Sequence, residues 1–143
     1  MDNESFVHLL EKMIERWDEN LFSELSNSGF QDVRPAHLAV LRALNSEGAR
    51  ATDIAQSAGI KKQSIAYLVA DLSNLGYVRI EVEPQDARAK RIYLTERGLA
   101  LQVSILSVGR TFEHWSESIV GADRFRAMRH ALALIAIEYR AGR

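Results

Sequence analysis

The hydrophobic pattern of the chain changes period at Gly76, and this change most restricts the fold that the chain can adopt. Between residues 61 and 75 the apolar residues recur at helical spacing, and Gly76 stands where a helix-ending glycine belongs. Over 78–83, apolar residues alternate with charged ones. The pattern therefore predicts a helix that ends at a glycine and passes directly into a half-buried strand.

A second strand and a preceding short helix complete the pattern around this helix. Residues 84–89 are typical of a turn-rich loop, and 91–94 indicate the strand that returns beside the first. Upstream, a short helix is predicted over 52–58, and Gly59 separates it from the helix that begins near Lys61. Two short helices joined by a glycine turn form a helix-turn-helix unit, and a hairpin directly after it is a wing.

Longer amphipathic helices are predicted on both sides of this unit. Apolar residues at helical spacing indicate helices over 3–27 and 35–45 before the short pair, and over 96–118 and 123–140 after the hairpin. Thr95 suits the N-cap of the helix that follows it. The expected fold class is mainly α with a small β-hairpin: a winged helix-turn-helix with long N- and C-terminal helices.

The composition excludes several classes of protein. The 143 residues include no cysteine, which rules out disulfide staples, cysteine nucleophiles and thiol redox sensing by this chain. There is no run of about 18 apolar residues and no sign of a signal peptide, so we expect a cytoplasmic protein without a membrane partner. Phosphate-binding glycine loops and the motifs G-x-S-x-G and H-E-x-x-H are absent, so we expect neither an enzyme nor a cofactor.

The charges are distributed unevenly, although the net charge is only −1. Residues 1–33 carry eight acidic side chains against two basic ones, whereas residues 61–97 carry seven basic side chains against five acidic ones. A net charge near zero argues against a protein that coats nucleic acid indiscriminately. The local excess of positive charge favours a nucleic-acid contact in the middle of the chain.

The start of the helix near Lys61 carries the predicted major-groove contacts. In a helix-turn-helix unit the N-terminal residues of the second helix touch base edges. The candidates all lie off the apolar stripe of the helix: Lys61, Lys62, Gln63, Ser64 and Tyr67. Lysine at a helix start opposes the helix dipole, and a DNA phosphate would offset that cost, while Gln63 has the groups to bond adenine. The alternative is a solvated basic turn without a ligand.

The hairpin carries the predicted minor-groove contact. Its DNA-binding candidates are Asp86, Arg88 and Lys90, with Arg88 near the tip. Asp86 stands two residues before Arg88, and we expect its carboxylate to hold the guanidinium in a forked pair. An arginine on a thin hairpin suits a narrow minor groove, where the potential is most negative. The alternative is a surface ion pair that contributes almost nothing to stability.

These motifs resemble the MarR family of winged-helix regulators. The resemblance covers residues 53–98, and its specific elements are Leu75-Gly76-Tyr77-Val78, Asp86-x-Arg88 and Leu94-Thr95-Glu96-Arg97-Gly98. Asp86 and Arg88 fall on the family's wing motif. The family's recognition-helix start falls on Lys62, Gln63 and Ser64.

The chain departs from the family pattern at three positions. Arg79 stands one residue before the usual basic position, which is Ile80 here, and this leaves open whether Arg79 reaches the DNA backbone. Ala87 replaces the middle arginine of the wing motif. Lys61 stands where many members have a capping serine or threonine.

The resemblance implies a function and an assembly. It implies one domain over 1–143, with 1–33 and 96–143 as dimerisation helices and 34–95 as the winged helix-turn-helix. The homodimer would bind double-stranded DNA at a pseudo-palindrome with half-sites about 34 Å apart. Family members commonly repress genes and are released by small, often aromatic, ligands, so a small-molecule effector is implied as well.

The apolar ends of the chain agree with a dimer. The helices at both ends are too apolar to lie exposed on a small winged domain, and patches of this kind usually mark an interface. The predicted interface residues are Phe6, Leu9, Leu10, Met13, Leu132, Ile135 and Tyr139. The alternative is that they form the ordinary core of a monomer.

Aromatic residues outside the predicted DNA-binding unit suggest where an effector would bind. The candidates for a ligand cleft are Trp17, Phe30, His37, Phe112 and Trp115. The alternative is that these are core aromatics.

Two other functions stay open. The first is a winged-helix module that binds protein and no longer binds DNA. The second is a metal-responsive regulator, for which the available ligands are four scattered histidines without a metal-ligand spacing: His8, His37, His114 and His130. We expect no metal site.

Overall fold

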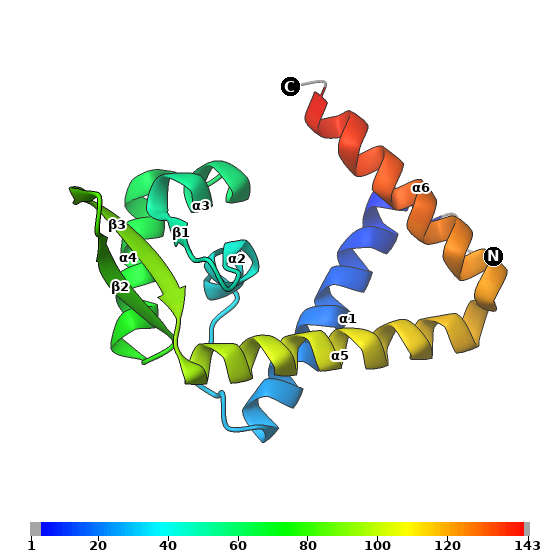
Figure 1. Ribbon diagram of the computed structural model, residues 1–143. Helices are drawn as coiled ribbons and strands as arrows, with labels where there is room; N and C mark the ends of the chain where they lie inside the picture. The colour runs from blue at the N-terminus through cyan, green and yellow to red at the C-terminus, as the bar shows by residue number, and fades with distance from the viewer. Residues whose placement is uncertain (1–3, 142–143) are drawn as a thin grey trace. The chain divides into compact units, whose positions relative to one another are not determined.

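The computed structural model describes residues 4–141 (Figure 1). The elements, in chain order, are α1 (Phe6–Asn27), α2 (His37–Ala43), β1 (Ala49–Arg50), α3 (Ala51–Ala58), α4 (Lys62–Asn74), β2 (Val78–Glu83), β3 (Asp86–Leu94), α5 (Glu96–Val120) and α6 (Ala122–Ala141). The predicted fold class is confirmed: the chain is mainly helical with a small antiparallel sheet. The two-residue strand β1 was not predicted.

Contacts divide the chain into two compact units on either side of Leu106, so α5 contributes to both. The first unit holds α1 to α4, the sheet and the first part of α5. The second holds the rest of α5 and α6. Within residues 4–141, no helix is both long enough and apolar enough to cross a bilayer. The domain boundaries expected from the sequence remain a prediction.

The sheet has the strand order β1-β3-β2, and both pairings are antiparallel. Val78 pairs with Leu94 and Val82 with Lys90, but the next β2 residue, Glu83, pairs with Asp86. Residues 87–89 therefore have no partner in this described register and form an irregularity on β3. Such a bulge bends a strand and redirects side chains, and this one lies beside the turn at residues 84–85 that ends the wing. Figure 1 shows this tip extending beyond α3 and α4.

Apolar side chains from α2, α3, α4, β2 and β3 form the core of the first unit. The residues at most 2% exposed include Val40, Leu41, Ile54, Ile65, Leu72, Val78 and Ile92. Leu21 and Leu25 of α1 and Leu101 of α5 are buried to the same degree. The helical stripe of α4 thus packs as its period predicts. The alternation predicted for β2 is wrong in its outer half, because Val78 is buried but Ile80 is 44% exposed and Val82 is 56% exposed.

Gly76 ends α4 as the sequence predicts. It adopts the left-handed conformation, with φ of +82°. Its N–H donates to Ser73 O at 3.0 Å, and the N–H of Tyr77 donates to Leu72 O at 2.9 Å. These two bonds are the Schellman motif, which satisfies carbonyls at the end of a helix and turns the chain sharply. The turn directs Val78 into the sheet.

The start of α5 is joined to this turn. Thr95 Oγ1 accepts the N–H of Gly98 at 3.1 Å, which is the predicted N-cap, and donates to Gly76 O at 2.6 Å. The N–H of Thr95 donates to Tyr77 O at 3.0 Å. Gly98 is buried because the helix approaches the Tyr77 backbone closely there. The end of α4 and the start of α5 therefore share one hydrogen-bonded junction.

A polar cluster locks the side chain of Tyr77 into this junction. Tyr77 is fully buried, and its hydroxyl donates to the carboxylate of Asp32. Arg97 donates to Asp32 at 3.0 Å, and its guanidinium carbon lies 4.2 Å from the centroid of the Tyr77 ring. Burial alone would raise the pKa of Asp32, but the hydrogen bonds from Tyr77 and Arg97 outweigh it and lower that pKa. Burial, with the Asp32 contact, raises the pKa of Tyr77.

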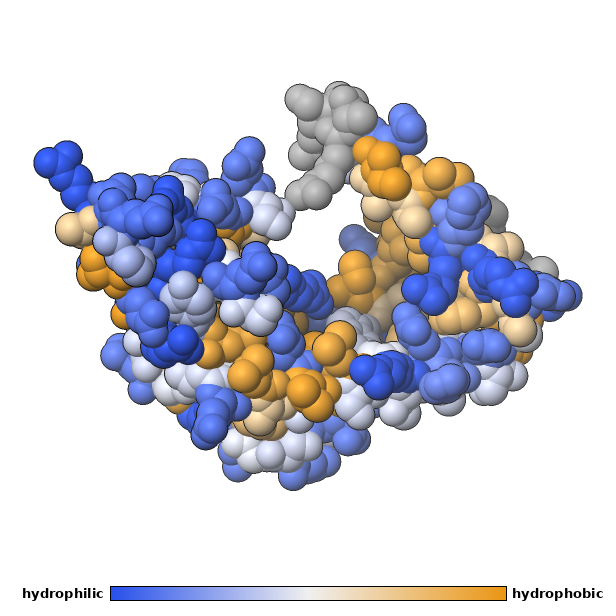
Figure 2. Space-filling model, in the orientation of Figure 1, coloured by the Kyte–Doolittle hydropathy of each residue, from blue (hydrophilic) through white to orange (hydrophobic). Residues whose placement is uncertain are grey.

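The second unit has little core of its own among the described residues. Phe125 is only 9% exposed, whereas other large apolar residues of α6 are exposed: Met128, Leu132, Leu134, Ile135, Ile137 and Tyr139. In Figure 2 apolar residues show on the surface over α6, and hydrophilic ones dominate the surface over the wing. Apolar residues of α1 are exposed too: Phe6, Val7, Leu9, Met13 and Ile14.

The close approach at Gly98 predicts that a methyl group there destabilises the fold. A Cβ on Gly98 would stand 2.0 Å from Tyr77 O, which is backbone and cannot turn aside. We expect Gly98→Ala to lower the free energy of unfolding by about 1–3 kcal/mol, as overpacking does. Urea unfolding measures this, with the exposed neighbour Ala100→Ser as control. A gain in stability, as helix propensity alone would give, would contradict the close approach.

Candidate nucleic-acid interface

The start of α4 presents the predicted major-groove residues to solvent. Lys61 is the N-cap, and its side chain makes no capping hydrogen bond. The five candidates Lys61, Lys62, Gln63, Ser64 and Tyr67 are all exposed, with Tyr67 at 66%. The opposite face of the helix is buried through Ile65 and Leu72. The first turn holds no acidic residue, so this helix start is a positively charged, exposed surface.

A tight turn sets the position of α4 against α3. Gly59 ends α3 in the left-handed conformation, with φ of +66° and ψ of +30°. The N–H of Ile60 then donates to Ala55 O at 3.1 Å. Ile54 of α3 and Ile65 of α4 are both fully buried in the core of this unit. The two helices therefore form the predicted helix-turn-helix, with the start of α4 exposed.

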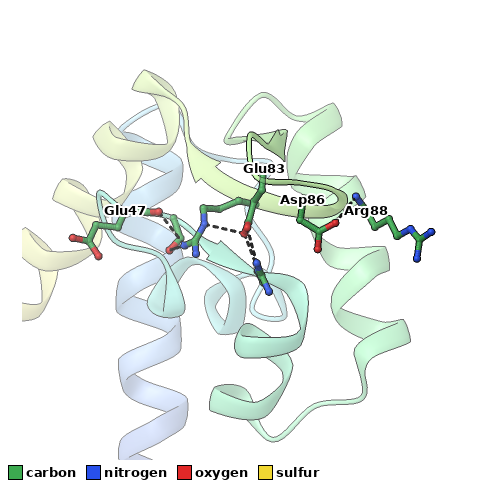
Figure 3. Close-up of polar contacts among 7 residues, drawn as sticks. Glu47, Glu83, Asp86 and Arg88 are labelled. Carbon is green, nitrogen blue, oxygen red and sulfur yellow. Dashed lines mark hydrogen bonds and ion pairs between the residues drawn. The ribbon is translucent and has the colours of Figure 1, made fainter.

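At the tip of the wing, the hydrogen bond of Asp86 differs from the one predicted. Asp86 Oδ1 accepts the backbone N–H of Arg88 at 3.0 Å, so the expected forked pair with the guanidinium was wrong. A short aspartate side chain readily bonds the N–H two residues on, which stabilises a turn. Figure 3 shows the side chain of Arg88 extending away from Glu83 and from the sheet. Asp86 therefore shapes the turn and leaves the guanidinium projecting.

Glu83, the last residue of β2, braces the wing between two arginines (Figure 3). Arg50 donates to its carboxylate through Nε at 2.7 Å and through Nη2 at 2.5 Å. Arg91 donates to the same carboxylate at 3.3 Å, and to Gly48 O at 3.1 Å. The hydrogen bonds of Arg50 lower the pKa of Glu83, against the opposing effect of burial. This brace connects all three strands.

Arg79 is engaged within the sheet. Its Nε donates to Glu81 at 2.6 Å, and its Nη1 donates to Leu94 O at 2.9 Å. Its guanidinium carbon lies 4.7 Å from the centroid of the Tyr93 ring. These contacts occupy the guanidinium, so Arg79 serves the wing's structure in this conformation.

A second polar cluster ties α2 to α4. His37 is fully buried, and its Nε2 lies 2.7 Å from Asp71 Oδ2. The N–H of Arg34 donates to His37 Nδ1 at 3.0 Å, and the Arg34 guanidinium also contacts Asp71. The His37 contact is the largest cause that lowers the pKa of Asp71. Tyr67 contributes to raising the pKa of Arg34, after the larger effect of Asp71, so this cluster lies close to the exposed face of α4. Both ring nitrogens of His37 are therefore engaged within the protein.

A basic hollow of about 360 Å³ lies where α3, α4 and the wing meet. Its lining includes Arg50, Thr52, Lys62, Arg88 and Lys90. Lys62, Arg88 and Lys90 were predicted, and the structure brings them together. The sequence analysis missed Arg50 and Thr52. The available signal was the position of Arg50 immediately before α3, which matches that of Lys61 before α4.

The arrangement of helix-turn-helix and wing accords with a sequence match. Residues 31–89 match the sequence profile described as the MarR family. The segment that holds the helix-turn-helix and the wing is therefore similar to MarR-family proteins. The resemblance stated from the sequence is confirmed over this segment, and a solved structure that shares the fold is described as a MarR family transcription regulator. No curated protein matches the chain.

Solved structures of MarR-family proteins share the fold over almost the whole chain. The Staphylococcus aureus MepR–DNA complex has a TM-score of 0.77 at 19% identity, covering 95% of this chain and 99% of that one. The transcriptional repressor CouR, bound to a 23-mer DNA duplex, has a TM-score of 0.75 at 24% identity, covering 92% of each chain. A mutant of Escherichia coli MarR has a TM-score of 0.71 at 17% identity, covering 95% of this chain and 99% of that one. At these identities the likeness establishes the fold.

The predicted effector residues fall in both units of this MarR-like chain. Trp17 and Phe30 are half-buried in the first unit; in the second, Phe112 is half-buried and Trp115 is 55% exposed. The second unit also holds a hollow of about 430 Å³, whose lining is mostly charged: Arg110, Glu113, His114, Arg126, Arg129 and His130. Phe112 and Trp115 do not line it. Among the described residues, no group of three or more His, Asp or Glu side chains is placed to hold a metal ion.

The brace at Glu83 predicts a pH-dependent contribution to stability. A carboxyl whose pKa is lowered on folding stabilises the protein above its ordinary pKa, and this contribution is lost as the pH falls through the folded-state pKa. We expect Glu83→Gln to lower the free energy of unfolding at pH 7, and the difference from the wild type to shrink as the pH falls below 4.5, the ordinary pKa of glutamate. Urea unfolding across this range measures it.

Glu81→Gln, on an exposed residue of the same strand, is the matched control. A difference between wild type and E83Q that stayed constant with pH would show that the charge of Glu83 does not support the brace.

Proposed function

We propose that this chain is a transcription regulator that binds double-stranded DNA as a homodimer. In this proposal α4 enters the major groove and the wing reaches the adjacent minor groove. Two symmetric copies would read a pseudo-palindromic operator. The cytoplasmic location expected from the sequence belongs to the same proposal, because a regulator of this kind must reach the chromosome.

The observation that carries the proposal is the exposed basic start of α4 beside a projecting wing arginine. Lys61 and Lys62 begin a helix that has neither a side-chain cap nor an acidic first turn. Arg88 extends from a tip that the Asp86 turn holds in shape. A helix start and a thin hairpin of this kind suit phosphate and groove contacts. The DNA complexes of MepR and CouR, which share the fold, support this use of it.

Exposed apolar residues on the terminal helices support the homodimer. Five of the seven predicted interface residues are at least 45% exposed: Phe6, Leu9, Met13, Ile135 and Tyr139. Leu132 is 38% exposed, and Leu10 is half-buried. Apolar surface on this scale favours association with a second copy through α1 and α6.

The proposal extends to repression that a small ligand relieves. CouR is described as a transcriptional repressor, and MepR has a structure bound to ethidium bromide. Trp17 and Phe30 in the first unit, and Phe112 and Trp115 in the second, remain the predicted effector residues. His37 supports an effector site only through packing, since its ring nitrogens are occupied.

Selection of genomic DNA fragments by the purified protein, at low and moderate salt, tests the proposal. Enrichment of a palindromic site with a steep loss of affinity at higher salt is the expected outcome, because phosphate contacts release counterions. A folded dimer that enriches no DNA at any salt would refute the proposal and favour a winged helix that binds protein.

The wing predicts the effect of removing Arg88. We expect Arg88→Ala to weaken operator binding by about 1–2 kcal/mol and to leave dimerisation unchanged, because the guanidinium projects from the tip. Fluorescence anisotropy and sedimentation measure the two properties. Arg42→Ala, on an exposed residue of α2, is the control for losing one positive charge. Unchanged affinity in R88A would exclude the wing contact.

The start of α4 predicts a different effect for Gln63. An amide that bonds adenine contributes to base preference, so Gln63→Ala should change the selected sequence more than the affinity for unrelated DNA. Repeating the genomic selection with the variant measures this. Equal weakening on every sequence would instead make Gln63 a backbone contact.

A further inference from the structure

Two helix starts near the wing carry cations where a helix favours anions. Arg50 is the N-cap of α3 and Lys61 that of α4, and neither makes a side-chain capping bond. Positive charge at these positions opposes the helix dipole, and the first amide groups of each helix lack intrahelical acceptors. The chain caps α1 and α5 conventionally, through Ser5 and Thr95. The two basic starts therefore need a reason other than helix stability.

Both helix starts open on the same hollow. The cavity of about 360 Å³ is lined by Arg50 and Thr52 from α3, Lys62 from α4 and Lys90 from the wing, among others. None of the residues that line it is acidic. Four cationic side chains, those of Arg50, Lys62, Arg88 and Lys90, and the hydroxyl of Thr52 converge there with the start of α3. These groups together match the chemistry of a phosphate group.

Arg50 has an acidic partner, but that partner is shared. Its side chain is 45% exposed and contacts Glu83, which also contacts Arg91. Glu83 raises the pKa of Arg50, with smaller contributions from Asp53 and Asp86. One carboxylate thus faces two guanidinium groups. When Arg50 turns to another anion, Arg91 still balances the charge of Glu83.

We propose that this hollow is a phosphate site that holds one backbone phosphate of the DNA. Arg50, Lys62 and Lys90 supply charge, and Thr52 and the start of α3 supply hydrogen bonds. The phosphate lies between the major-groove contact of α4 and the minor-groove contact of Arg88. This inference rests on the proposed DNA-binding function and adds Arg50 and Thr52 to its machinery. The site fixes the position of the chain on the duplex and carries no base preference.

Opposite effects of two substitutions separate a phosphate site from a purely structural brace. Arg50→Gln removes a phosphate contact, so affinity should fall about tenfold on all sequences and the log–log salt slope should lose about 0.9. Glu83→Gln removes the competing carboxylate, so affinity should stay equal or rise. Both substitutions break the same ion pair, and a structural brace would make both weaken DNA binding with an unchanged salt slope. That result would overturn the proposal.

Arg42→Gln is the matched control, because its side chain lines a separate hollow between α2 and α3. We expect R42Q to retain the salt slope of the wild type. Unfolding of each variant at the assay temperature confirms that the protein tested is folded.

Neutral methylphosphonates, introduced one at a time into the operator, locate the phosphate. At one position per half-site the methylphosphonate should lower the operator affinity of the wild type, and it should not lower the affinity of R50Q any further. If R50Q loses affinity at every position as the wild type does, Arg50 contacts no phosphate and the proposal fails.

A separate arm distinguishes failure of the site from failure of DNA binding. Inorganic pyrophosphate is titrated into the free protein while the amide signals of residues 51–53 and 62–64 are followed by NMR. Saturable shifts that R50Q abolishes support the site even if the wild type binds no DNA, with a free phosphate compound as its ligand. If the shifts are absent from a wild type that also shows no Arg50-dependent phosphate on DNA, the site does not exist.

Discussion

The candidate DNA contacts depend on the junction at which α4 ends, β2 begins and α5 starts. Gly76 turns the chain through two backbone bonds, and the side chain of Thr95 binds the carbonyl of that same glycine. Tyr77 fills the core beneath the turn, and Gly98 lets α5 approach its backbone. Because α4 and α5 share these groups, the recognition helix cannot tilt without disturbing the start of α5. The orientation of α4 is therefore set by the same hydrogen bonds and packing that set the start of α5.

The charges of the first unit explain how a nearly neutral chain can present a positive surface. Three carboxylates are held by arginines within the fold: Asp32 by Arg97, Asp71 by Arg34, and Glu83 by Arg50 and Arg91. Asp71 also contacts the ring of His37. Each of the three has a lowered pKa, so each stays ionised and compensated. The first turn of α4 has no such acidic group. The net charge of −1 is therefore a poor guide, because placement decides which cations remain available for an anionic partner.

Local patterns predicted the fold well and the long-range contacts poorly. The change of period at Gly76 and the glycine at 59 predicted α3, α4 and the hairpin, because these depend on neighbouring residues. Strand β1 was missed because two residues are too few to show alternation. His37 was expected in a ligand cleft, but its burial depends on Asp71, 34 residues away, and no local pattern reveals such a pair. The forked Asp86 pair was wrong because the backbone N–H competes with the guanidinium for the same carboxylate.

Arg50 shows how a small error in a helix boundary conceals a functional residue. The helix was expected to begin at residue 52 with Thr52 in its first turn, but α3 begins at Ala51 and Arg50 is its N-cap. The argument already applied to Lys61 then applies to Arg50, since both place a cation where the dipole is positive. Helices α1 and α5 follow the capping rules through Ser5 and Thr95, whereas α2 has Ala36 as its N-cap, with neither a side-chain capping bond nor a charge there. Local rules are commonly broken where function requires it. Here the capping rule is broken at two helix starts, and both helix starts lie at the same hollow. Together they support a bound anion more strongly than either does alone, because helix stability explains neither cation and one anion explains both.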